Sequence, residues 1–445
     1  MSEMSYLEKL LDGAEVEWKP LREVCDFKNG FAFKSNLFKE TGLPIIRITN
    51  IDGFNVNLDE VKYFSPNDYK EDMSSFEVSM GDIVIAMSGA TTGKVGFYKN
   101  ETRCYLNQRV GKFVPKRNLL NNKYLYHFLL LNTQAIYILA GGGAQPNLSS
   151  NALMSKLLIP IPSSSNPEKS LAIQAEIVRI LDKFTALTAE LTAELTMRKK
   201  QYNYYRDQLL SFDEEQEKPI YLEKLLDGVE VEWKSLGEVA EIYGGLTGKT
   251  KADFEKGNAR YISYKKIFGS LDIKNMPTDY VHVREDERQH EVRYGDILFT
   301  GSSEIAEEAG ISCAVTSQFD EPVYLNSFSF GVRFNNKIKL TPEFLKYIFR
   351  TNKMRKEISK TASGVTRFNI SKARFKKILI PILCPNNPEK SLAIQSEIVR
   401  ILDKFDTLTN SITEGLPREI ELRQKQYEYY RDLLFSFPKP ETVSN

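Results

Sequence analysis

The chain contains three blocks of sequence twice, and this internal repeat constrains its fold more than any other feature. The paired blocks are residues 6–13 and 221–228, 166–174 and 387–395, and 176–184 and 397–405. Each pair is identical, and the single exchange between the second and third pairs is Ala175 for Ser396. Duplication on this scale predicts one structural frame that is used twice.

Between the repeated blocks lie two long inserts, Phe27 to Ile161 and Ile242 to Ile382, which show little obvious similarity to each other. A chain of 445 residues is too long for one ordinary core, so each insert has room for a domain of its own. A repeated frame with two divergent inserts predicts two domains that recognise different things through one pseudo-symmetric scaffold.

The composition is that of an ordinary soluble globular protein, with 42% hydrophobic and 27% charged residues. No run approaches the roughly 18 apolar residues of a membrane span, and the N-terminus lacks the basic and apolar pattern of a signal peptide. We therefore expect a cytoplasmic protein with no membrane contact. The net charge is only +1, so a nucleic-acid surface would need its basic residues gathered on one face.

Residues that commonly bind metals are few and scattered. The four cysteines form no Cys-x-x-Cys pair, and there are three histidines; these residues are Cys25, Cys104, Cys313, Cys384, His127, His282 and His290. We expect the cysteines to be small buried side chains in a reducing compartment. We assign no metal site.

Both inserts show the same order of predicted elements. Short β-rich runs bounded by glycine, asparagine and proline predict strands, and longer periodic runs predict helices. The first insert has strands at 43–49 and 81–87 and a helix at 122–139; the second has strands at 260–264, 295–300 and 376–381 and a helix at 341–360. The shared order predicts an α+β chain in which one α/β domain fold occurs twice, with the divergence in the loops.

Residues 166 to about 212 predict one long helix. Asn166 and Pro167 are favoured cap and first-turn residues, and apolar residues recur at helical spacing from Ile173 to Leu195. At about 1.5 Å per residue this helix would extend some 60 to 70 Å, more than one small domain needs.

A copy of this helix, residues 387–437, supplies the partner that a single apolar stripe needs, and we expect the two helices to pack antiparallel. Proline disrupts helical hydrogen bonding, so a kink or break is expected at Gly415-Leu-Pro417. The first helix contains the tetrad Thr-Ala-Glu-Leu twice in succession, at 188–191 and 192–195. These tetrads form a good helical seam; a further hypothesis is that they set the distance between the inserts.

This combination of blocks resembles the specificity subunit of type I restriction-modification enzymes, and it looks closest to the IC branch of that family. The resemblance rests on Tyr-Leu-Glu-Lys-Leu-Leu-Asp-Gly at the start of each half, on the two blocks in each long helix and on the tetrads. It covers essentially the whole chain.

The resemblance implies that each insert is a target recognition domain that reads one half of an asymmetric, interrupted sequence in double-stranded DNA. The paired helices would hold the domains at a fixed separation and dock two methyltransferase subunits, to which two restriction and translocation subunits attach. S-adenosylmethionine, ATP and magnesium would belong to those partners, so we expect no cofactor in this chain. The implied parts are an opening segment with the first recognition domain (1–161), a central long helix (162–215), an opening segment with the second recognition domain (216–382), a C-terminal long helix (383–437) and a tail (438–445).

Two glycine-rich turns, 89–95 and 245–250, share a few residues with phosphate-binding loops. Neither has the four intervening residues and the Gly-Lys-Ser/Thr ending that wrap a nucleoside triphosphate. A lysine and hydroxyls on a flexible glycine turn suit contact with DNA phosphates or base edges better. An ordinary hairpin turn is the alternative.

We predict DNA contacts at side chains whose polar groups match DNA: arginine for guanine, asparagine and glutamine for adenine, serine and threonine for either, and lysine for phosphate. In the first insert these are Lys34, Ser35, Arg47, Thr49, Asn50, Ser88, Thr91, Thr92, Lys94, Asn107, Gln108, Arg109, Gln145 and Asn147. In the second they are Lys249, Lys251, Tyr264, Lys265, Lys266, Ser302, Ser303, Asn326, Ser327, Thr366, Arg367 and Asn369. For each one taken singly, a solvated loop residue or a turn former is the alternative.

Both long helices end in the same cluster of tyrosines followed by arginine. The members are Tyr202, Tyr204, Tyr205, Arg206, Tyr427, Tyr429, Tyr430 and Arg431. Stacking on bases is one interpretation. Because the clusters belong to the repeated frame, we favour packing against the opening segments or docking of a partner subunit, with Asp207 and Asp432 ordering the arginines.

Motifs of several enzyme classes are missing. There is no Asn-Pro-Pro-Tyr or Asp-Pro-Pro-Tyr; the nearest sequence, Asn386 to Glu389, lacks the second proline and the aromatic residue that hold a flipped base. Gly-x-Ser-x-Gly and His-Glu-x-x-His are also absent. We therefore expect a non-catalytic DNA-recognition subunit. The rival hypotheses are a fused, self-contained modification or restriction enzyme and a tandem scaffold that binds only proteins.

Overall fold

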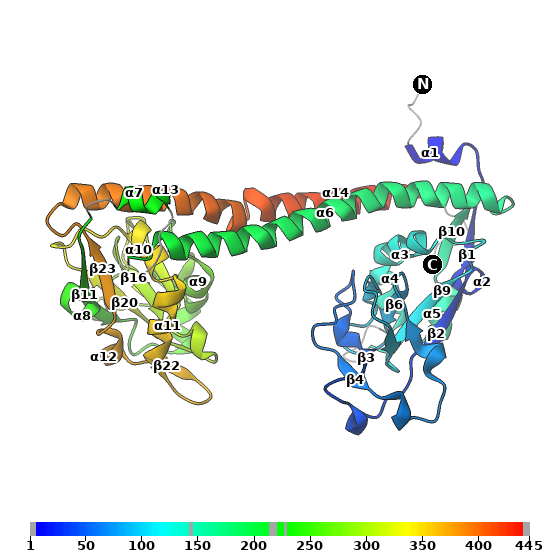
Figure 1. The fold of residues 1–445 in the computed structure, drawn as a ribbon, viewed down its shortest axis with the longest axis horizontal. Helices are drawn as coiled ribbons and strands as arrows, with labels where there is room; N and C mark the ends of the chain where they lie inside the picture. The colour runs from blue at the N-terminus through cyan, green and yellow to red at the C-terminus, as the bar shows by residue number, and fades with distance from the viewer. Residues whose placement is uncertain (1–5, 142–145, 213–219, 227–228, 439–445) are drawn as a thin grey trace. The chain divides into compact units, whose positions relative to one another are not determined.

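The computed structural model describes residues 6–141, 146–212, 220–226 and 229–438, and the chain forms two compact units. Unit 1 comprises Met1–Leu191 and Ile420–Asn445, and unit 2 comprises Thr192–Glu419. The long helix α6 (Pro167–Leu209) contributes to both, and the boundary falls between its two Thr-Ala-Glu-Leu tetrads. Figure 1 shows the elements of each unit.

Unit 1 is built on two four-stranded sheets. Its first elements are α1 (Tyr6–Leu11), β1 (Val16–Pro20), α2 (Leu21–Val24), β2 (Cys25–Asn29), η1 (Ser35–Leu37), β3 (Leu43–Ile46), η2 (Ile48–Asn50), β4 (Lys62–Phe64), η3 (Pro66–Asp68), η4 (Met73–Phe76) and β5 (Glu77–Val78). They are followed by β6 (Ile83–Ala86), β7 (Val95–Phe97), β8 (Cys104–Leu106), β9 (Val110–Pro115), α3 (Asn122–Leu131), α4 (Thr133–Leu139), α5 (Ser150–Lys156) and β10 (Leu158–Pro162). The strand orders are β2-β9-β6-β7 and β4-β3-β8-β5, and β1 pairs with β10.

Unit 2 repeats this plan with an extra hairpin. Its first elements are α7 (Ile220–Leu225), β11 (Val231–Ser235), α8 (Leu236–Val239), β12 (Ala240–Gly244), η5 (Lys251–Phe254), β13 (Ala259–Ile262), α9 (Tyr264–Gly269), β14 (Asp272–Ile273), β15 (Asp279–Val281), β16 (Ile297–Thr300), β17 (Ser302–Ser303) and η6 (Ala306–Glu308). They are followed by β18 (Ser312–Val315), β19 (Val323–Leu325), β20 (Ser329–Phe334), α10 (Pro342–Ile348), α11 (Asn352–Lys360), β21 (Ala362–Ser363), β22 (Phe368–Ile370), α12 (Lys372–Phe375), β23 (Leu379–Leu383) and α13 (Pro388–Asn410). The strand orders are β12-β20-β16-β18-β14, β15-β13-β19 and β17-β22-β21, and β11 pairs with β23.

The two units share one fold, as the order of predicted elements indicated. The outer pair β1–β10 runs antiparallel with Val16 opposite Pro162, and β11–β23 does the same with Val231 opposite Leu383. The parallel pair β3–β8 of unit 1 is matched by the parallel pair β13–β19 of unit 2. Inserts that look unrelated in sequence therefore share the central part of their strand order, and they differ in the edge strands β5 and β14.

The predicted helices of the inserts are each divided in two. In unit 1 the break falls at Asn132, whose side-chain amide donates to the carbonyl of Phe128, one turn back, at 2.8 Å. In unit 2 the break precedes Asn352, because Thr351 starts a new helix by accepting a hydrogen bond from the Met354 amide at 3.3 Å. Short polar side chains compete in this way with helical hydrogen bonding.

A buried glutamine of the repeated block joins helix α6 or α13 to the insert in each unit. In unit 1, Gln174 accepts from the amide of Asn121, the cap of α3, at 2.8 Å and donates to the carbonyl of Leu119 at 3.0 Å. In unit 2, Gln395 accepts from the amide of Thr341, the cap of α10, at 3.0 Å. Both amides are completely buried, so the same polar junction holds two different inserts.

The two copies of the long-helix sequence meet through aromatic residues. Within unit 1, Phe184 of α6 stacks on Tyr430 of α14 (Gly415–Leu434) with ring centroids 5.0 Å apart. Within unit 2, Tyr205 of α6 stacks on Phe405 of α13 at 5.5 Å. Each unit therefore pairs a segment of α6 with a segment of the second copy.

The second copy is not one continuous helix. It stops at Asn410 and restarts as α14 at Gly415, whose φ of 78° is outside the helical range. A β carbon on Gly415 would overlap the carbonyl oxygen of Thr407. The break predicted at Gly415-Leu-Pro417 is therefore confirmed, and proline lies in the first turn of the new helix, where it is tolerated.

The four cysteines are buried and unpaired, as predicted. Burial raises the pKa of Cys25 and that of Cys313 to about 12, so both thiols stay protonated. Across the described residues, no group of three or more histidine, cysteine, aspartate or glutamate side chains is placed to hold a metal ion. No helix in the same part of the chain has the length and apolar character that crossing a membrane requires.

Candidate nucleic-acid interface

In both units, the loops that follow three equivalent strands are joined into one edge of the domain. The strands are β3, β6 and β8 in unit 1 and β13, β16 and β19 in unit 2; a fourth segment precedes α5 or α12. We define the loop edge of unit 1 as residues 47–50, 88–94, 107–109 and 146–149. The loop edge of unit 2 is residues 263–266, 301–303, 326–328 and 362–370.

Backbone hydrogen bonds assemble the loop edge of unit 1. The amide of Asn107 donates to the carbonyl of Ile46, at the end of β3, at 3.0 Å. The amide of Met87, just after β6, donates to the carbonyl of Arg109 at 2.8 Å, and the amide of Leu148 donates to the carbonyl of Met87 at 2.7 Å. Four segments that are distant in sequence thus become neighbours.

Unit 2 assembles its loop edge in the same way. The amide of Asn326 donates to the carbonyl of Ile262, at the end of β13, at 3.1 Å. The amide of Gly301, just after β16, donates to the carbonyl of Phe328 at 2.8 Å, and the amide of Ile370 donates to the carbonyl of Gly301 at 2.9 Å. The two units therefore have the same backbone arrangement at their loop edges, but the side chains on the two edges differ.

A glycine is required beside each loop edge. A β carbon added to Gly30 would overlap the backbone carbonyl of Asn107, and one added to Gly245 would overlap the backbone carbonyl of Asn326. These glycines follow β2 and β12 and let the chain pass against the edge. Any other residue at either position would push the β8 or β19 loop outward.

Most of the predicted side chains of unit 1 lie on the loop edge or next to it. Residue Lys34 and the short helix η1 lie beside the edge, because the preceding Phe31 forms a bridge with Asn107. Asn147 bridges Ser88, while Gln145 lies outside the described residues. The exposed members of the predicted set are Lys34, Ser35, Thr49, Lys94, Gln108, Arg109 and Asn147.

Three half-buried members of the set carry a polar atom without a partner. Arg47 Nε, Ser88 Oγ and Thr91 Oγ1 are each inaccessible to solvent and have no hydrogen-bond partner in the part of the chain that the structure describes. An unsatisfied buried donor costs about 1–3 kcal/mol, so most proteins avoid it. A ligand with hydrogen-bonding groups would remove that cost only through a rearrangement that turns these atoms toward it.

Other predicted side chains are used inside the protein. Asn50 accepts from the amide of Arg47 at 2.9 Å, and the hydroxyl of Thr92 donates to the carbonyl of Pro146 at 3.1 Å. Asn326 donates to a carbonyl of β13 at 3.0 Å and accepts two further hydrogen bonds. All three side chains are buried. These three residues stabilise turns inside the protein, which was the alternative to DNA contact. They are therefore not among the proposed DNA contacts.

The glycine-rich turn of unit 1 joins two strands, β6 and β7. Gly89 and Gly93 have φ of 80° and 85°, which suits glycine at a tight turn. A nucleotide-binding loop leads into a helix whose N-terminus holds phosphate, and here a strand follows instead. The turn is therefore a hairpin between two strands and not a nucleotide-binding loop.

In unit 2 the predicted side chains fall into an exposed group and a buried group. The exposed members are Lys251, Lys265, Lys266, Ser327, Thr366, Arg367 and Asn369. Ser302 and Ser303 are buried and form β17, which pairs with β22 of the extra hairpin. The hydroxyl of Tyr264 donates to the carbonyl of Ser302 at 2.7 Å, which attaches α9 and its two lysines to the edge.

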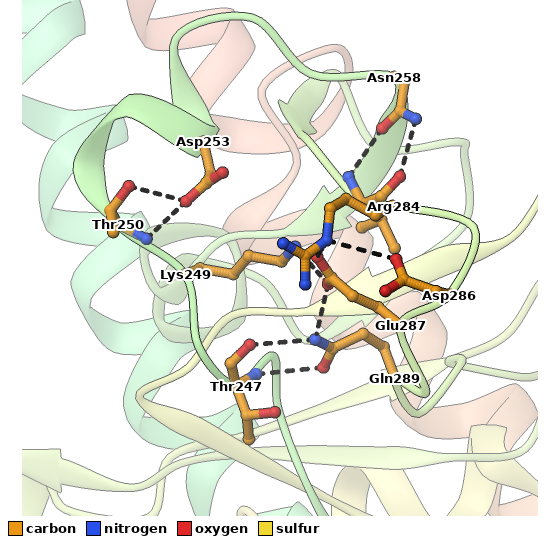
Figure 2. Close-up of polar contacts among 10 residues, drawn as sticks. Thr247, Lys249, Thr250, Asp253, Asn258, Arg284, Asp286, Glu287 and Gln289 are labelled. Carbon is orange, nitrogen blue, oxygen red and sulfur yellow. Dashed lines mark hydrogen bonds and ion pairs between the residues drawn. The ribbon is translucent and has the colours of Figure 1, made fainter.

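Lys249 departs most clearly from the predicted site. Its ammonium group pairs with Glu287, and its side chain is only 2% exposed (Figure 2). Gln289 fastens the same loop by accepting from the Thr247 amide at 3.1 Å and donating to the Thr247 carbonyl at 3.0 Å. Hydrogen bonds from Lys249 and Gln289 lower the pKa of Glu287 to about 2. This lysine is an internal anchor, not a free group on a flexible turn, and we leave it out of the proposed contacts.

Two exposed apolar residues of unit 2 were missed by a prediction that considers only hydrogen-bonding side chains. Phe328 is 63% exposed next to Ser327, and Val365 is 92% exposed at the turn of the β21–β22 hairpin. Both lie on the loop edge, where they add apolar surface to its polar side chains. Their exposure depends on the folded loops, so no local sequence pattern indicated either residue.

The tyrosine clusters have an inner and an outer side. Tyr202 and Tyr427 are buried, whereas Tyr204 and Tyr429 are exposed. The stacked rings of Tyr205 and Tyr430 contact Phe405 and Phe184, as described above. Each arginine pairs with the following aspartate: Arg206 with Asp207 at 3.0 Å and Arg431 with Asp432 at 2.9 Å.

The chain matches known proteins over its full length. The family model for the type I restriction modification DNA specificity domain matches twice, over residues 14–197 and 228–422. The specificity subunit of the type I restriction enzyme EcoR124I/EcoR124II of Escherichia coli is 40% identical over 459 residues, with 100% of both chains covered. The specificity subunit of the type I restriction enzyme EcoprrI of Escherichia coli is 33% identical over 435 residues, with 93% of each chain covered.

A solved structure supports the fold. It comes from work on complex assembly and conformational transition of the type I restriction-modification system, and it has a TM-score of 0.59 with 14% sequence identity over 94% of this chain and 97% of that one. The finer assignment to the IC branch remains a prediction. The repeated domain model and the full-length relatives show that this chain belongs to the family of type I restriction-modification specificity subunits.

Proposed function

We propose that each unit reads one half of a bipartite, interrupted sequence in double-stranded DNA through its loop edge. The observation that carries the proposal is that both units assemble the same backbone edge and furnish it with different polar side chains. Phosphate contacts position a protein on DNA, whereas different base-reading side chains specify different sequences. A shared backbone with different side chains therefore suits two unlike half-sites.

In unit 1, the partnerless atoms of Arg47, Ser88 and Thr91 support this proposal. Base edges in the major groove offer acceptors to arginine, and both donors and acceptors to hydroxyl groups. DNA bound at this edge would supply the missing partners once binding turns these side chains toward it. The exposed Gln108 and Arg109 lie on the adjoining loop and extend the set of base-reading groups.

Phosphate contacts are proposed for Lys34, Lys94, Lys265 and Lys266, which are exposed basic side chains on or beside the edges, and for the exposed Lys251 of η5. Each phosphate that is neutralised releases counterions, so binding would weaken steeply as salt rises. A net charge of +1 over the whole chain gives little general attraction for DNA, which makes these local lysines more important.

We further propose the five-part division stated above, with 1–161 and 216–382 as recognition domains and 162–215 and 383–437 as the helical scaffold between them. Half-sites read from one side of DNA lie about 34–36 Å apart for one helical turn. The two tetrads at 188–195, where the units join, would set this spacing.

The scaffold would dock two methyltransferase subunits, to which two restriction and translocation subunits attach. The exposed Tyr204 and Tyr429 occupy equivalent places in the repeated clusters and are the proposed docking contacts, with Tyr205, Arg206, Tyr430 and Arg431 beside them. S-adenosylmethionine, ATP and magnesium would be bound by those partners, in the cytoplasm where the genomic DNA lies, and this chain would perform no catalysis itself.

A gel-shift assay of the chain with its methyltransferase partner, on a pool of random duplexes and over a range of salt, tests the proposal. Sequence-selective binding that weakens with salt supports it. Turnover by the isolated chain would favour the rival enzyme hypothesis, and indifference to DNA would favour the protein-only scaffold.

A further inference from the structure

The β21–β22 hairpin of unit 2 is held firmly on the loop edge. Strand β22 pairs with β21 on one side and with β17 on the other, where Asn369 lies opposite Ser302. At the turn, Gly364 has a φ of 149°, and a β carbon there would overlap the carbonyl oxygen of Arg367. Arg367 lies in this turn, directly before β22, so its position is fixed by the tight turn and by the ladders on both sides of the strand that follows.

The side chain of Arg367 is also held. Its Nε donates to the hydroxyl of Ser302 at 3.0 Å, and its guanidinium carbon lies 5.8 Å from the centroid of the Phe328 ring. Ser302 is itself only 5% exposed and accepts the hydroxyl of Tyr264 at its carbonyl. Within the described residues, the bond from Nε is the one hydrogen bond that this guanidinium makes. The N–H groups of Nη1 and Nη2 are therefore available to a ligand.

We propose that Arg367 reads a guanine in the half-site of unit 2 and that Ser302 is its positioning residue. This inference rests on the proposed function and names one base contact within it. Two terminal nitrogens of a planar guanidinium match O6 and N7 of guanine, which is the commonest specific arginine contact in the major groove. Ser302 holds Nε, and the Phe328 ring lies beside the guanidinium. The side chain of Arg367 therefore loses less conformational entropy when it contacts the base.

A phosphate contact is the competing role for an exposed arginine. The neighbouring helix α9 already carries Lys265 and Lys266, which are better suited to phosphate because a flexible ammonium acts as a point charge. Arg367, in contrast, is held at its Nε, and its two terminal nitrogens are available to bond a base. The test must separate loss of one base preference from a uniform loss of affinity.

The experiment compares the complete restriction-modification complex carrying Arg367→Gln with the unaltered complex, by sequencing the methylated sites in genomic DNA. We expect the preference for one guanine, in one half-site, to fall by roughly 5- to 150-fold. All other positions and the gap are expected to stay the same. Unchanged preference at every position, or an equal fall in methylation at all sites, would overturn the proposal and indicate no contact or a phosphate contact.

Lys337→Gln is the matched control. It also removes one positive charge from unit 2, but Lys337 follows the end of β20 that is opposite to the loop edge, since Ser329 at the start of β20 pairs with Thr300. Its methylated sites are expected to match those of the unaltered complex. A change of the same base with Lys337→Gln would show that net charge, not the guanidinium, sets the preference.

Variants of Ser302 test the positioning role. Ser302→Ala is expected to weaken the preference for the same guanine, with no further loss when combined with Arg367→Gln, and Ser302→Thr is expected to restore it because the hydroxyl remains. Additive losses, or no rescue by threonine in a complex that assembles normally, would contradict the role. Absence of any bipartite site in the unaltered complex would instead refute the proposed function itself.

Discussion

The ring of Phe184 stacks on the ring of Tyr430 with centroids 5.0 Å apart and an angle of 18° between the planes. The repeat places the equivalent contact between Phe405 and Tyr205. Each phenylalanine thus contacts the tyrosine of the other repeat, so neither half of the duplicated sequence completes its own aromatic contact. The exchange explains why the last part of the chain, from Ile420, belongs to the first unit.

Removing one of these rings is expected to loosen only its own unit. Phe184→Ala and Phe405→Ala are each expected to lower the free energy of unfolding of that unit by about 1–3 kcal/mol, through lost burial and lost stacking. Hydrogen exchange measures this as faster exchange in α14 for the first variant and in α13 for the second. Leu187→Ala is the control, since Leu187 lies on the same helix but is 38% exposed. Equal increases of exchange in α13 and α14 would contradict the assignment of each ring contact to its own unit.

Replacing the buried glutamines is expected to cost more. In Gln174→Leu, the Asn121 amide and the Leu119 carbonyl would lose their buried partner, and the expected loss of stability is about 2–5 kcal/mol. Gln395→Leu is expected to do the same to unit 2. Chemical denaturation of each variant checks the size. Gln134→Leu, at an exposed site of α4, is expected to change little, and comparable losses in the two kinds of variant would refute the junction role.

The buried His127 is expected to make unit 1 less stable in mild acid. Its Nε2 donates to Asp182 at 3.2 Å and its Nδ1 accepts from the hydroxyl of Tyr427 at 2.9 Å, an arrangement that suits the neutral ring. Burial lowers the pKa of His127 below its ordinary value near 6.5, although Asp182 opposes this and Lys123 and Arg431 reinforce it.

Because the unfolded chain therefore gains the proton first, stability is expected to fall as the pH drops below about 6.5. Urea unfolding at pH 7.5 and at pH 5.5 measures the change. His127→Tyr is expected to remove it, since Tyr347 occupies the equivalent place in unit 2 and bonds Asp403 at 2.5 Å. His282→Gln, at an exposed histidine, is expected to keep the full dependence on pH. An identical pH response in His127→Tyr would refute the assignment.

Two lysines near each other in sequence are expected to respond in opposite ways. Lys249→Met is expected to destabilise unit 2, because Glu287 loses its buried partner, and to leave the salt dependence of DNA binding unchanged in the folded fraction. Lys251→Met, at an exposed position, is expected to leave stability unchanged and to reduce the salt slope of binding by about one. The reverse result would restore Lys249 as a DNA contact.

The repeated frame could be predicted from sequence because its physical signals are local. An Asn-Pro start, a helical stripe and a Gly-x-Pro break each act over a few residues, and the helices begin and break where these signals occur. The only sign in the sequence from which we predicted that the two inserts share a fold was the common order of their predicted strands and helices. A residual sequence signal of this fold is Tyr-Leu-Asn, at 105–107 and 324–326, where the asparagine amide closes each loop edge.

The direction of individual side chains could not be predicted, because it depends on partners far away in sequence. Lys249 is withdrawn from solvent by Glu287, which lies 38 residues later in the chain. Asn326 bonds a carbonyl 64 residues earlier and so turns inward. Arg367 is restrained by Ser302 at a separation of 65 residues. Residue type indicates what a loop side chain can bond, and only the fold decides what it does bond.

We propose that two unlike edges read two half-sites at a distance set by α6. The most direct measurement is sequencing of the methylated sites left by the complete complex after one Thr-Ala-Glu-Leu unit is inserted between Leu191 and Thr192. Four residues add about 6 Å of helix, and base pairs rise about 3.4 Å. We expect the same two half-sites with a gap longer by one or two base pairs. An unchanged gap, or altered half-sites with the old gap, would contradict it.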